Sequence, residues 1–204
     1  MKFRADDLML KQGLAESREK AKRLIMAGEV YVYQNNNLVK INKPGHFYPA
    51  DRCLQLKQPD RFVSRGGYKL LTALEHFGLS IKGCTALDVG ASTGGFTDCL
   101  LQYGASLVYA VDVGYGQLHW KLRQNERVIN LERINMRYAP DDLLPELVDV
   151  VAVDCSFISV QKILFPSYKF LKENGSILVL VKPQFELPAG QTEKGVVRQS
   201  KLHR

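Results

Sequence analysis

Long apolar segments are missing from this sequence of 204 residues. The longest purely apolar run, Ile177 to Val181, is far shorter than the roughly 20 residues of a membrane helix. The polar start, Met1 to Asp7, lacks the apolar region of a signal peptide. Because 46% of the residues are nevertheless hydrophobic, we expect a globular cytoplasmic protein that neither spans a membrane nor is exported.

Residue patterns that hold metals or disulfide bonds are also missing. The four cysteines have no paired spacing, and the four histidines cluster neither with them nor with one another. We therefore expect reduced cysteines and no metal site, as is usual in the reducing cytoplasm. The residues concerned are Cys53, Cys84, Cys99, Cys155, His46, His76, His119 and His203.

Acidic residues are too few to balance the basic ones, and the net charge is +7. Residues 1–63 contain 12 Lys or Arg against 7 Asp or Glu, so most of the excess lies in less than a third of the chain. A basic segment of this kind favours a polyanionic partner, and nucleic acid is the commonest one in the cytoplasm. A solvated surface that happens to be basic is the alternative at this point.

Residues 1–58 have the pattern of a small α+β domain. Ser17 is a typical N-cap for a helix that Gly28 would end, and the alternating residues after it predict a hairpin with a turn at Asn35–Asn37. The predicted elements are helices at Leu8–Leu14 and Ser17–Ala27 and strands at Glu29–Tyr33 and Leu38–Ile41.

The second predicted helix carries basic residues opposite its apolar face, where they could follow a phosphate backbone. The pattern of small and apolar residues from Gly13 to Val32 resembles the small RNA-binding domain named after ribosomal protein S-four. This resemblance covers about residues 3–57 and implies docking on structured RNA by shape and phosphate contacts. The contacts expected on this basis are Arg4, Arg18, Lys22 and Arg23, although each could instead be a solvated charge.

Strands and helices alternate in the rest of the chain. Residues 59–65 predict a linker, and a helix with one apolar face is predicted at Gly67–Phe77. Short strands with room for crossover helices follow, so residues 66–204 are expected to form a parallel, doubly wound α/β sheet. The predicted strands are Ala86–Gly90, Leu107–Val113, Val128–Leu131, Val148–Asp154 and Ile177–Val181.

A glycine-rich turn, Asp88 to Phe96, follows the first of these strands. Ligands of parallel α/β sheets bind over the carboxyl ends of strands, and glycines let them approach the backbone. The dinucleotide fingerprint would need glycine in place of Ser92, and no Gly-Lys-Ser/Thr loop occurs, so NAD and nucleoside triphosphates fit poorly. Asp112, at the end of the next strand, could accept hydrogen bonds from both hydroxyls of a ribose.

Together these residues favour S-adenosylmethionine as the cofactor of a Rossmann-like methyltransferase. Asp88 could alternatively only orient the turn, and Asp112 could cap its strand; both roles are compatible with cofactor binding. The residues expected at the cofactor site are Asp88, Gly90, Ala91, Ser92, Gly94, Phe96 and Asp112.

Two further predicted strands end in charged residues, Asp154 and Lys182. If these strands are neighbours, both side chains emerge beside the cofactor. A lysine held there by Asp154 could accept the proton of a hydroxyl nucleophile or stabilise its developing negative charge. This arrangement favours methyl transfer to a hydroxyl, and the alternative is a structural ion pair.

Other methyl acceptors fit less well. Transfer to an exocyclic amine typically uses Asn/Asp-Pro-Pro-aromatic, whereas residues 154–157 read Asp-Cys-Ser-Phe. Transfer to C5 of a pyrimidine needs a nucleophilic cysteine, typically after proline, and Cys155 is more typical of a small packed residue.

The catalytic residues resemble those of FtsJ-type RNA ribose 2′-O-methyltransferases, whose pattern is Lys-Asp-Lys-Glu. Lys69, in Ser64–Leu70, stands where that pattern has its first lysine, so Lys69, Asp154 and Lys182 are the implied catalytic residues. With the basic domain in front and residues 194–198 behind, residues 3–204 resemble the TlyA or hemolysin A family. Membership implies methylation of ribosomal RNA or ribosomal subunits, and the family label also suggests a cytolysin.

The fourth residue of the pattern is missing, because the family's Glu lies beyond the last predicted strand. Glu186 and Glu193 follow Lys182 too closely to replace it. We therefore expect a C-terminal truncation and an incomplete sheet, whose open edge favours self-association. An RNA-binding protein with a catalytically incomplete methyltransferase fold is the second hypothesis, and a cytolysin, which would need a membrane-active segment, is the third.

Overall fold

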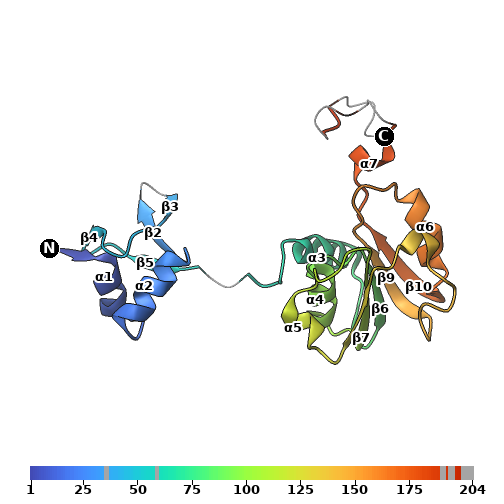
Figure 1. Cartoon of the computed structure of the whole chain (residues 1–204), viewed down its shortest axis with the longest axis horizontal. Helices are drawn as coiled ribbons and strands as arrows, with labels where there is room; N and C mark the ends of the chain where they lie inside the picture. Colours follow the sequence, from blue (N-terminus) through green and yellow to red (C-terminus); the bar gives the residue numbers. More distant parts are fainter. Residues whose placement is uncertain (35–36, 58–59, 189–191, 193–195, 199–204) are drawn as a thin grey trace. The chain divides into compact units, whose positions relative to one another are not determined.

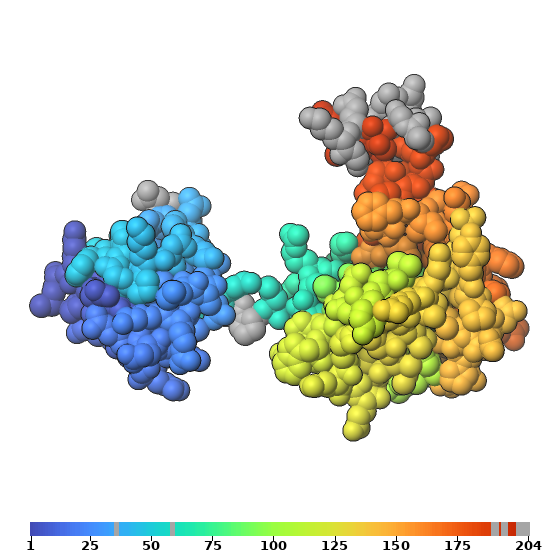
Figure 2. Space-filling model, in the orientation of Figure 1, coloured from blue at the N-terminus to red at the C-terminus, as the bar shows by residue number. Residues whose placement is uncertain are grey.

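The computed structural model describes residues 1–34, 37–57, 60–188, 192 and 196–198. The chain divides into two compact units, Met1–Pro59 and Asp60–Arg204, each with its own packed core (Figures 1 and 2). Among the described residues, no helix combines the length and the apolar character needed to cross a bilayer. The predicted turn residues Asn35 and Asn36 lie outside this description.

The N-terminal unit contains two helices and two small antiparallel sheets. One sheet pairs β1 with β4, and the other has the order β3-β2-β5. The elements are β1 (Lys2–Arg4), α1 (Ala5–Lys11), α2 (Arg18–Met26), β2 (Val30–Gln34), β3 (Asn37–Lys40), β4 (Phe47–Pro49) and β5 (Leu54–Leu56).

Local chemistry sets the bounds of α2. The Ser17 side chain accepts a hydrogen bond from the Lys20 amide at 3.2 Å, and Gly28 follows the helix with a φ of +74°, in the left-handed region that favours glycine. The first helix was predicted three residues too late: it begins at Ala5 and ends at Lys11. Its start is set by β1, a strand too short to be recognised in the sequence.

Apolar faces of both helices and both sheets form the core of the N-terminal unit. Its fully buried members include Met9 on α1, Ile25 on α2 and Val32 on β2. A charged residue is buried with them: the Asp6 side chain is 0% exposed and holds two arginines. Asp6 accepts hydrogen bonds from Arg4 at 3.0 Å and from Arg18 at 3.2 Å.

The C-terminal unit is built on a five-stranded parallel sheet of order β10-β9-β6-β7-β8 (Figure 1). The predicted α/β class is thus confirmed. The strands are β6 (Thr85–Val89), β7 (Leu107–Asp112), β8 (Val128–Glu132), β9 (Val148–Val153) and β10 (Leu171–Val179). The helices are α3 (Gly66–Phe77), α4 (Gly95–Gln102), α5 (Trp120–Arg123), the 3-10 helix η1 (Met136–Tyr138), α6 (Gln161–Tyr168) and α7 (Pro183–Glu186).

Side chains alternate between two buried layers, one on each face of the sheet. On β6, Ala86 packs into the layer that contains Leu70 of α3 and Leu100 of α4. Its neighbour Leu87 packs into the opposite layer, with Ile163 of α6. Because both faces of the strands are covered, their sequences read as continuous apolar runs, as is typical of parallel sheets.

The last strand differs from its prediction. β10 begins six residues earlier than Ile177, at Leu171, and ends at Val179 rather than Val181. Residues 172–176 are polar or glycine, so hydrophobicity does not mark them, and the pairing with β9 shifts register between Leu171 and Ser176. β10 lies at one edge of the described sheet, and self-association through this edge stays a prediction.

The Asp6 cluster yields the first testable prediction. Burial raises the pKa of Asp6, but the hydrogen bonds from Arg4 and Arg18 outweigh burial and hold it below its ordinary value of 3.8. Asp6 therefore stabilises the fold above pH 3.8, and this stabilisation is lost as the pH falls through the lowered pKa. Asp6→Asn should lower the opening free energy of α1 by about 2 to 4 kcal/mol at pH 7, measured by amide hydrogen exchange.

Asp7→Asn is the matched control. Its side chain is 37% exposed, and its contact with Arg18 at 3.3 Å should contribute less than about 1 kcal/mol. Equal effects of the two substitutions at pH 7, or an Asp6→Asn effect that does not become smaller as the pH falls below 3.8, would contradict this account.

Candidate active site

The glycine-rich turn after β6 lies against the chain that leaves β9. Gly90 has a φ of +86°, and a Cβ atom there would lie 2.9 Å from the carbonyl oxygen of Asp154. Glycine is therefore required both by the backbone conformation and by the close approach. This contact places the turn and Asp154 side by side at the carboxyl edge of the sheet.

The turn then leads into α4. Gly94, the N-cap of α4, has a φ of +94°, and a Cβ atom there would lie 2.2 Å from a methyl carbon of Leu122. Ser92 adopts a positive φ of +48° without being glycine, which is uncommon and is found at functional turns. Gly94 thus allows the turn to pack against Leu122, whereas Ser92 lies on the side of the turn that faces the cavity.

Asp112, at the end of β7, is fixed by the backbone around it. One carboxylate oxygen accepts a hydrogen bond from the Ser92 amide at 2.8 Å, and the other accepts one from the Gly114 amide at 2.7 Å. Each oxygen keeps a lone pair, because a carboxylate has about four acceptor sites. Asp112 is therefore oriented in advance to accept hydrogen bonds from two hydroxyl groups.

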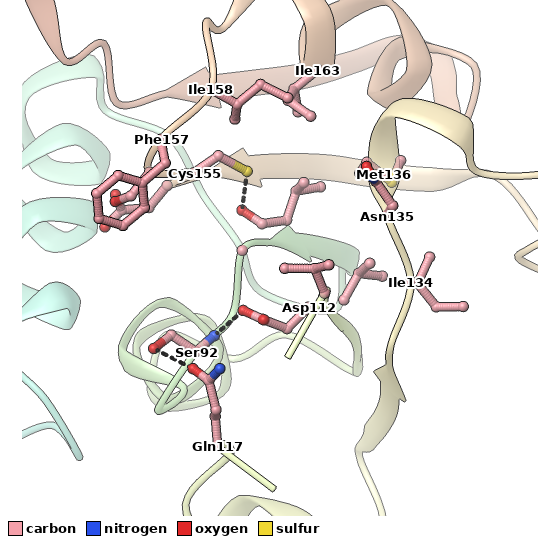
Figure 3. Close-up of a pocket in the computed structure, with 16 residues that line it drawn as sticks. Ser92, Asp112, Gln117, Ile134, Asn135, Met136, Cys155, Phe157, Ile158 and Ile163 are labelled. Atoms are coloured by element: carbon pink, nitrogen blue, oxygen red, sulfur yellow. Dashed lines mark hydrogen bonds between the residues drawn. The ribbon is translucent and has the colours of Figure 1, made fainter. Parts of the chain in front are cut away.

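A cavity of about 430 Å³ opens beside these residues, within the range of small-molecule sites (Figure 3). Of the predicted cofactor residues, Gly90, Ser92 and Asp112 line it. Figure 3 shows Ser92 hydrogen-bonded both to Asp112 and to Gln117.

Sequence reasoning missed several residues that line this cavity. They include Gln117, Asn135, Met136, Ser156, Phe157, Ile158 and Ile163. Asn135 and Met136 follow β8, so the rule that ligands bind at strand carboxyl ends could have found them. Phe157 has a φ of +64° and is 91% exposed, and no pattern in the sequence marks this.

Cys155 also lines the cavity, with its thiol directed to the carbonyl oxygen of Val89 at 3.6 Å (Figure 3). Burial raises the pKa of Cys155 to about 12. A thiol that keeps its proton is a weak nucleophile. Cys155 is thus a packed residue, as its position after Asp154 indicated.

Four predicted cofactor residues, Asp88, Ala91, Gly94 and Phe96, do not line the larger cavity. Asp88 is fully buried and accepts a hydrogen bond from the Thr97 hydroxyl at 2.6 Å, which connects the end of β6 to the first turn of α4. Ala91 and Phe96 instead line a smaller neighbouring hollow of about 220 Å³.

The smaller hollow contains the three predicted catalytic residues, Lys69, Asp154 and Lys182. Lys182 forms an ion pair with one carboxylate oxygen of Asp154, and Lys69 lies 3.4 Å from the other. β9 and β10 are neighbours, so their carboxyl ends bring Asp154 and Lys182 together. Asp154 lines both hollows and therefore joins them.

Lys69 reaches this site because α3 packs tightly against α4. A Cβ atom at Gly95 of α4 would lie 2.8 Å from the Gly67 nitrogen and 2.3 Å from the Ser64 hydroxyl. The absence of a side chain at Gly95 thus lets the start of α3 approach the turn. Lys69 then lies on the first turn of α3, above Asp154.

The described glutamate nearest to Lys182 in sequence has another role. Glu186 accepts hydrogen bonds from the Ser159 hydroxyl at 2.7 Å and the Val160 amide at 2.8 Å. These donors lie at the start of α6, so Glu186 caps that helix. Glu193, Lys194 and Gly195 lie outside the described residues.

The predicted RNA contacts are brought together only in part. Arg4 and Arg18 share Asp6, although they are 14 residues apart in sequence. Lys22 and Arg23 lie further along α2, with Lys22 one turn from Arg18. Arg23 is exposed and Lys22 is half-buried.

Asp88 provides a second prediction. Burial raises its pKa to about 7, and Asp154 and Asp112 add to this, although Thr97 opposes it. Because the folded pKa is raised, stability is lost as the pH increases from about 4 to about 7. The wild-type free energy of unfolding should fall by on the order of 2 to 4 kcal/mol over this range, and Asp88→Asn should remove this fall. Urea unfolding of wild type and of Asp88→Asn between pH 4 and pH 8 would measure it. Parallel stability curves for the two proteins would show that Asp88 does not titrate in this range.

Two known families match the chain, and they divide it as the two units do. The FtsJ-like methyltransferase family matches residues 62–204, and the S4 domain family matches residues 3–43. A solved structure from Streptococcus thermophilus is 49% identical, has a TM-score of 0.70, and is matched over 99% of this chain and 74% of its own.

Similar curated proteins carry rRNA methyltransferase or hemolysin names. The 16S/23S rRNA (cytidine-2′-O)-methyltransferase TlyA of Mycobacterium tuberculosis is 41% identical, over 95% of this chain and 72% of that protein. Hemolysin A of Brachyspira hyodysenteriae is also 41% identical, over 95% of this chain and 79% of that protein. The chain therefore belongs to the FtsJ-like methyltransferase family, in the group of TlyA and hemolysin A proteins.

Proposed function

We propose that this protein is an S-adenosylmethionine-dependent methyltransferase that methylates the ribose 2′-hydroxyl of a cytidine in ribosomal RNA. The observation that carries this proposal is the cluster of Lys69, Asp154 and Lys182 in the smaller hollow, which Asp154 joins to the larger cavity. The names of the similar M. tuberculosis and Campylobacter jejuni proteins support the choice of rRNA and of cytidine.

The larger cavity fits the cofactor. Asp112 has free lone pairs for the two ribose hydroxyls, Gly90 leaves room for close approach, and Asn135 and Met136 follow the next strand, where the adenine would lie. S-adenosylmethionine, when bound, supplies an electrophilic methyl group on a sulfonium sulfur. Ser92, on the glycine-rich turn, and its hydrogen-bond partner Gln117, which follows β7, would also contact the cofactor.

The lysines and Asp154 prepare the acceptor. We assign to Lys182, as the neutral amine, the removal of the hydroxyl proton while the oxygen attacks in line. Asp154 orients Lys182 through the contact between its carboxylate and the Lys182 nitrogen, and its negative charge favours a cation in the adjoining cavity. Lys69, on the other side of Asp154, would hold the RNA backbone beside the hydroxyl.

The N-terminal unit would supply the RNA affinity. We assign residues 1–58 to RNA binding, 59–65 to the linker and 66–204 to the methyltransferase domain. Arg4, Arg18, Lys22 and Arg23 are the proposed phosphate contacts, and ribosomal RNA or a ribosomal subunit in the cytoplasm is the proposed partner. Because Arg4 and Arg18 also hold Asp6, their substitution affects stability as well.

Binding without turnover is the second candidate function. Glu186 caps α6 instead of facing the lysines, so no glutamate completes Lys-Asp-Lys in the part of the chain that the structure describes. In that case the chain would bind RNA and S-adenosylmethionine and transfer no methyl group.

A methyl-transfer assay separates these functions. The chain would be incubated with labelled S-adenosylmethionine and separated small and large ribosomal subunits, with resistance to alkaline cleavage locating the modified ribose. Lys182→Ala should lower the rate about 10²- to 10⁴-fold and change the Kd for S-adenosylmethionine less than threefold. Lys169→Ala, which removes an exposed lysine paired with Asp141, is the control.

Four outcomes are informative. Labelling of one subunit that depends on Lys182 supports the enzyme, and cofactor and RNA binding without labelling supports the second candidate. If Lys182→Ala labels as well as wild type, the assigned mechanism is wrong. Lysis of erythrocytes by the purified chain would favour a cytolysin instead.

RNA binding gives a further prediction. Lys22→Ala and Arg23→Ala should each weaken binding to ribosomal RNA, because each removes one phosphate contact. Each should also reduce the slope of log K against log salt by about 0.7 to 0.9. Glu19→Gln on the same helix removes a repelling charge and should strengthen binding. Binding titrations from 50 mM to 200 mM salt would check this, and unchanged slopes would place the RNA elsewhere.

A further inference from the structure

Ser156 occupies the junction between the two hollows. It lines the larger cavity together with Asp112, and it lines the smaller one together with Lys69. Its hydroxyl accepts a hydrogen bond from the Lys182 Nζ at 2.8 Å. Ser156 is therefore in direct contact with the proposed base and at the point where cofactor and acceptor would meet.

This contact limits the directions in which Lys182 can act. As the neutral amine, Lys182 has two N–H groups and one lone pair. Its nitrogen contacts the carboxylate of Asp154 and the Ser156 oxygen, so when the two N–H groups face these oxygens the lone pair is left to take the proton of the acceptor hydroxyl. The Lys182 side chain is only 16% exposed, and its orientation therefore depends on these two partners.

The loop that carries Ser156 is itself held in place. Phe157, the next residue, has a φ of +64°, which costs roughly 1 kcal/mol or more for a residue other than glycine. Ser159 and Val160 donate hydrogen bonds to Glu186, four residues after Lys182. The loop is thus tied to the segment of Lys182 at two points, and these contacts offset the strain at Phe157.

We propose that Ser156 is a positioning residue, which fixes the direction of the Lys182 nitrogen toward the acceptor hydroxyl. This inference rests on the proposed function, in which Lys182 takes the proton. Ser156 acts through Lys182 and forms no bond with the methyl group. A serine that merely lines a surface hollow would have no effect on Lys182.

The kinetic test uses Ser156→Ala in the full 204-residue chain. Loss of the hydroxyl should lower kcat for methyl transfer about 10-fold, because misdirection of a catalytic group slows the chemical step. The KM for RNA and the Kd for S-adenosylmethionine should stay within twofold of wild type. Ser156→Thr keeps the hydroxyl and should restore most of kcat.

A second measurement does not need turnover. Reductive methylation with formaldehyde and a borane reagent, followed by peptide mass spectrometry, reports how accessible each lysine nitrogen is. Ser156→Ala should raise the rate at Lys182 several-fold and leave the rate at Lys162 unchanged. Ser106→Ala is the matched control, because its hydroxyl binds the carbonyl oxygens of Gly83 and Cys84, away from the site.

The two readouts distinguish two kinds of failure. If wild type transfers no methyl group to any RNA, the proposed function fails, and the role of Ser156 is then decided by the Lys182 reactivity. If Ser156→Ala leaves that reactivity unchanged, or leaves kcat unchanged in an active enzyme, the positioning role is wrong. A rise in reactivity, with a fall in kcat wherever turnover occurs and recovery in Ser156→Thr, supports it.

Discussion

The site depends on how Asp154 is held. Its amide donates a hydrogen bond to the carbonyl of Val89 at 3.0 Å, and its own carbonyl lies against Gly90. The strand that carries the glycine-rich turn therefore determines the position of this one residue through its backbone. The side chain is then free to face both lysines. The position of the cofactor cavity relative to the hollow that contains the lysines is therefore fixed. Movement of β6 or β9 would disturb both the cavity and the hollow.

The strands of the sheet could be predicted from the sequence because they are short apolar runs bounded by turns. The meeting of Asp154 and Lys182 followed from a rule about parallel strands, and the structure places them together. Ser156, Asp6 and Glu186 escaped prediction for a shared physical reason. Each acts through a contact between segments whose approach is set by tertiary packing, and no local spacing encodes such a contact. The polar start of β10 was missed because backbone pairing alone makes it a strand.

The basic N-terminal unit is less positive at its arginine cluster than its composition indicates. Arg4 and Arg18 contact Asp6 and Asp7, so the four charges cancel locally. Their guanidinium groups nevertheless keep N–H donors in fixed directions, which suits recognition by shape more than attraction at a distance. Lys22 and Arg23 lie on α2 outside these ion pairs. In this unit, Arg4 and Arg18 are therefore suited to orienting a bound polyanion, and Lys22 and Arg23 to attracting it.

The cap that Glu186 places on α6 connects this helix to the segment that follows Lys182. α6 covers one face of the sheet through Ile163, and its first turn is bonded to the short segment that begins at Lys182. The position of α6 and the position of the Lys182 segment are therefore linked through Glu186.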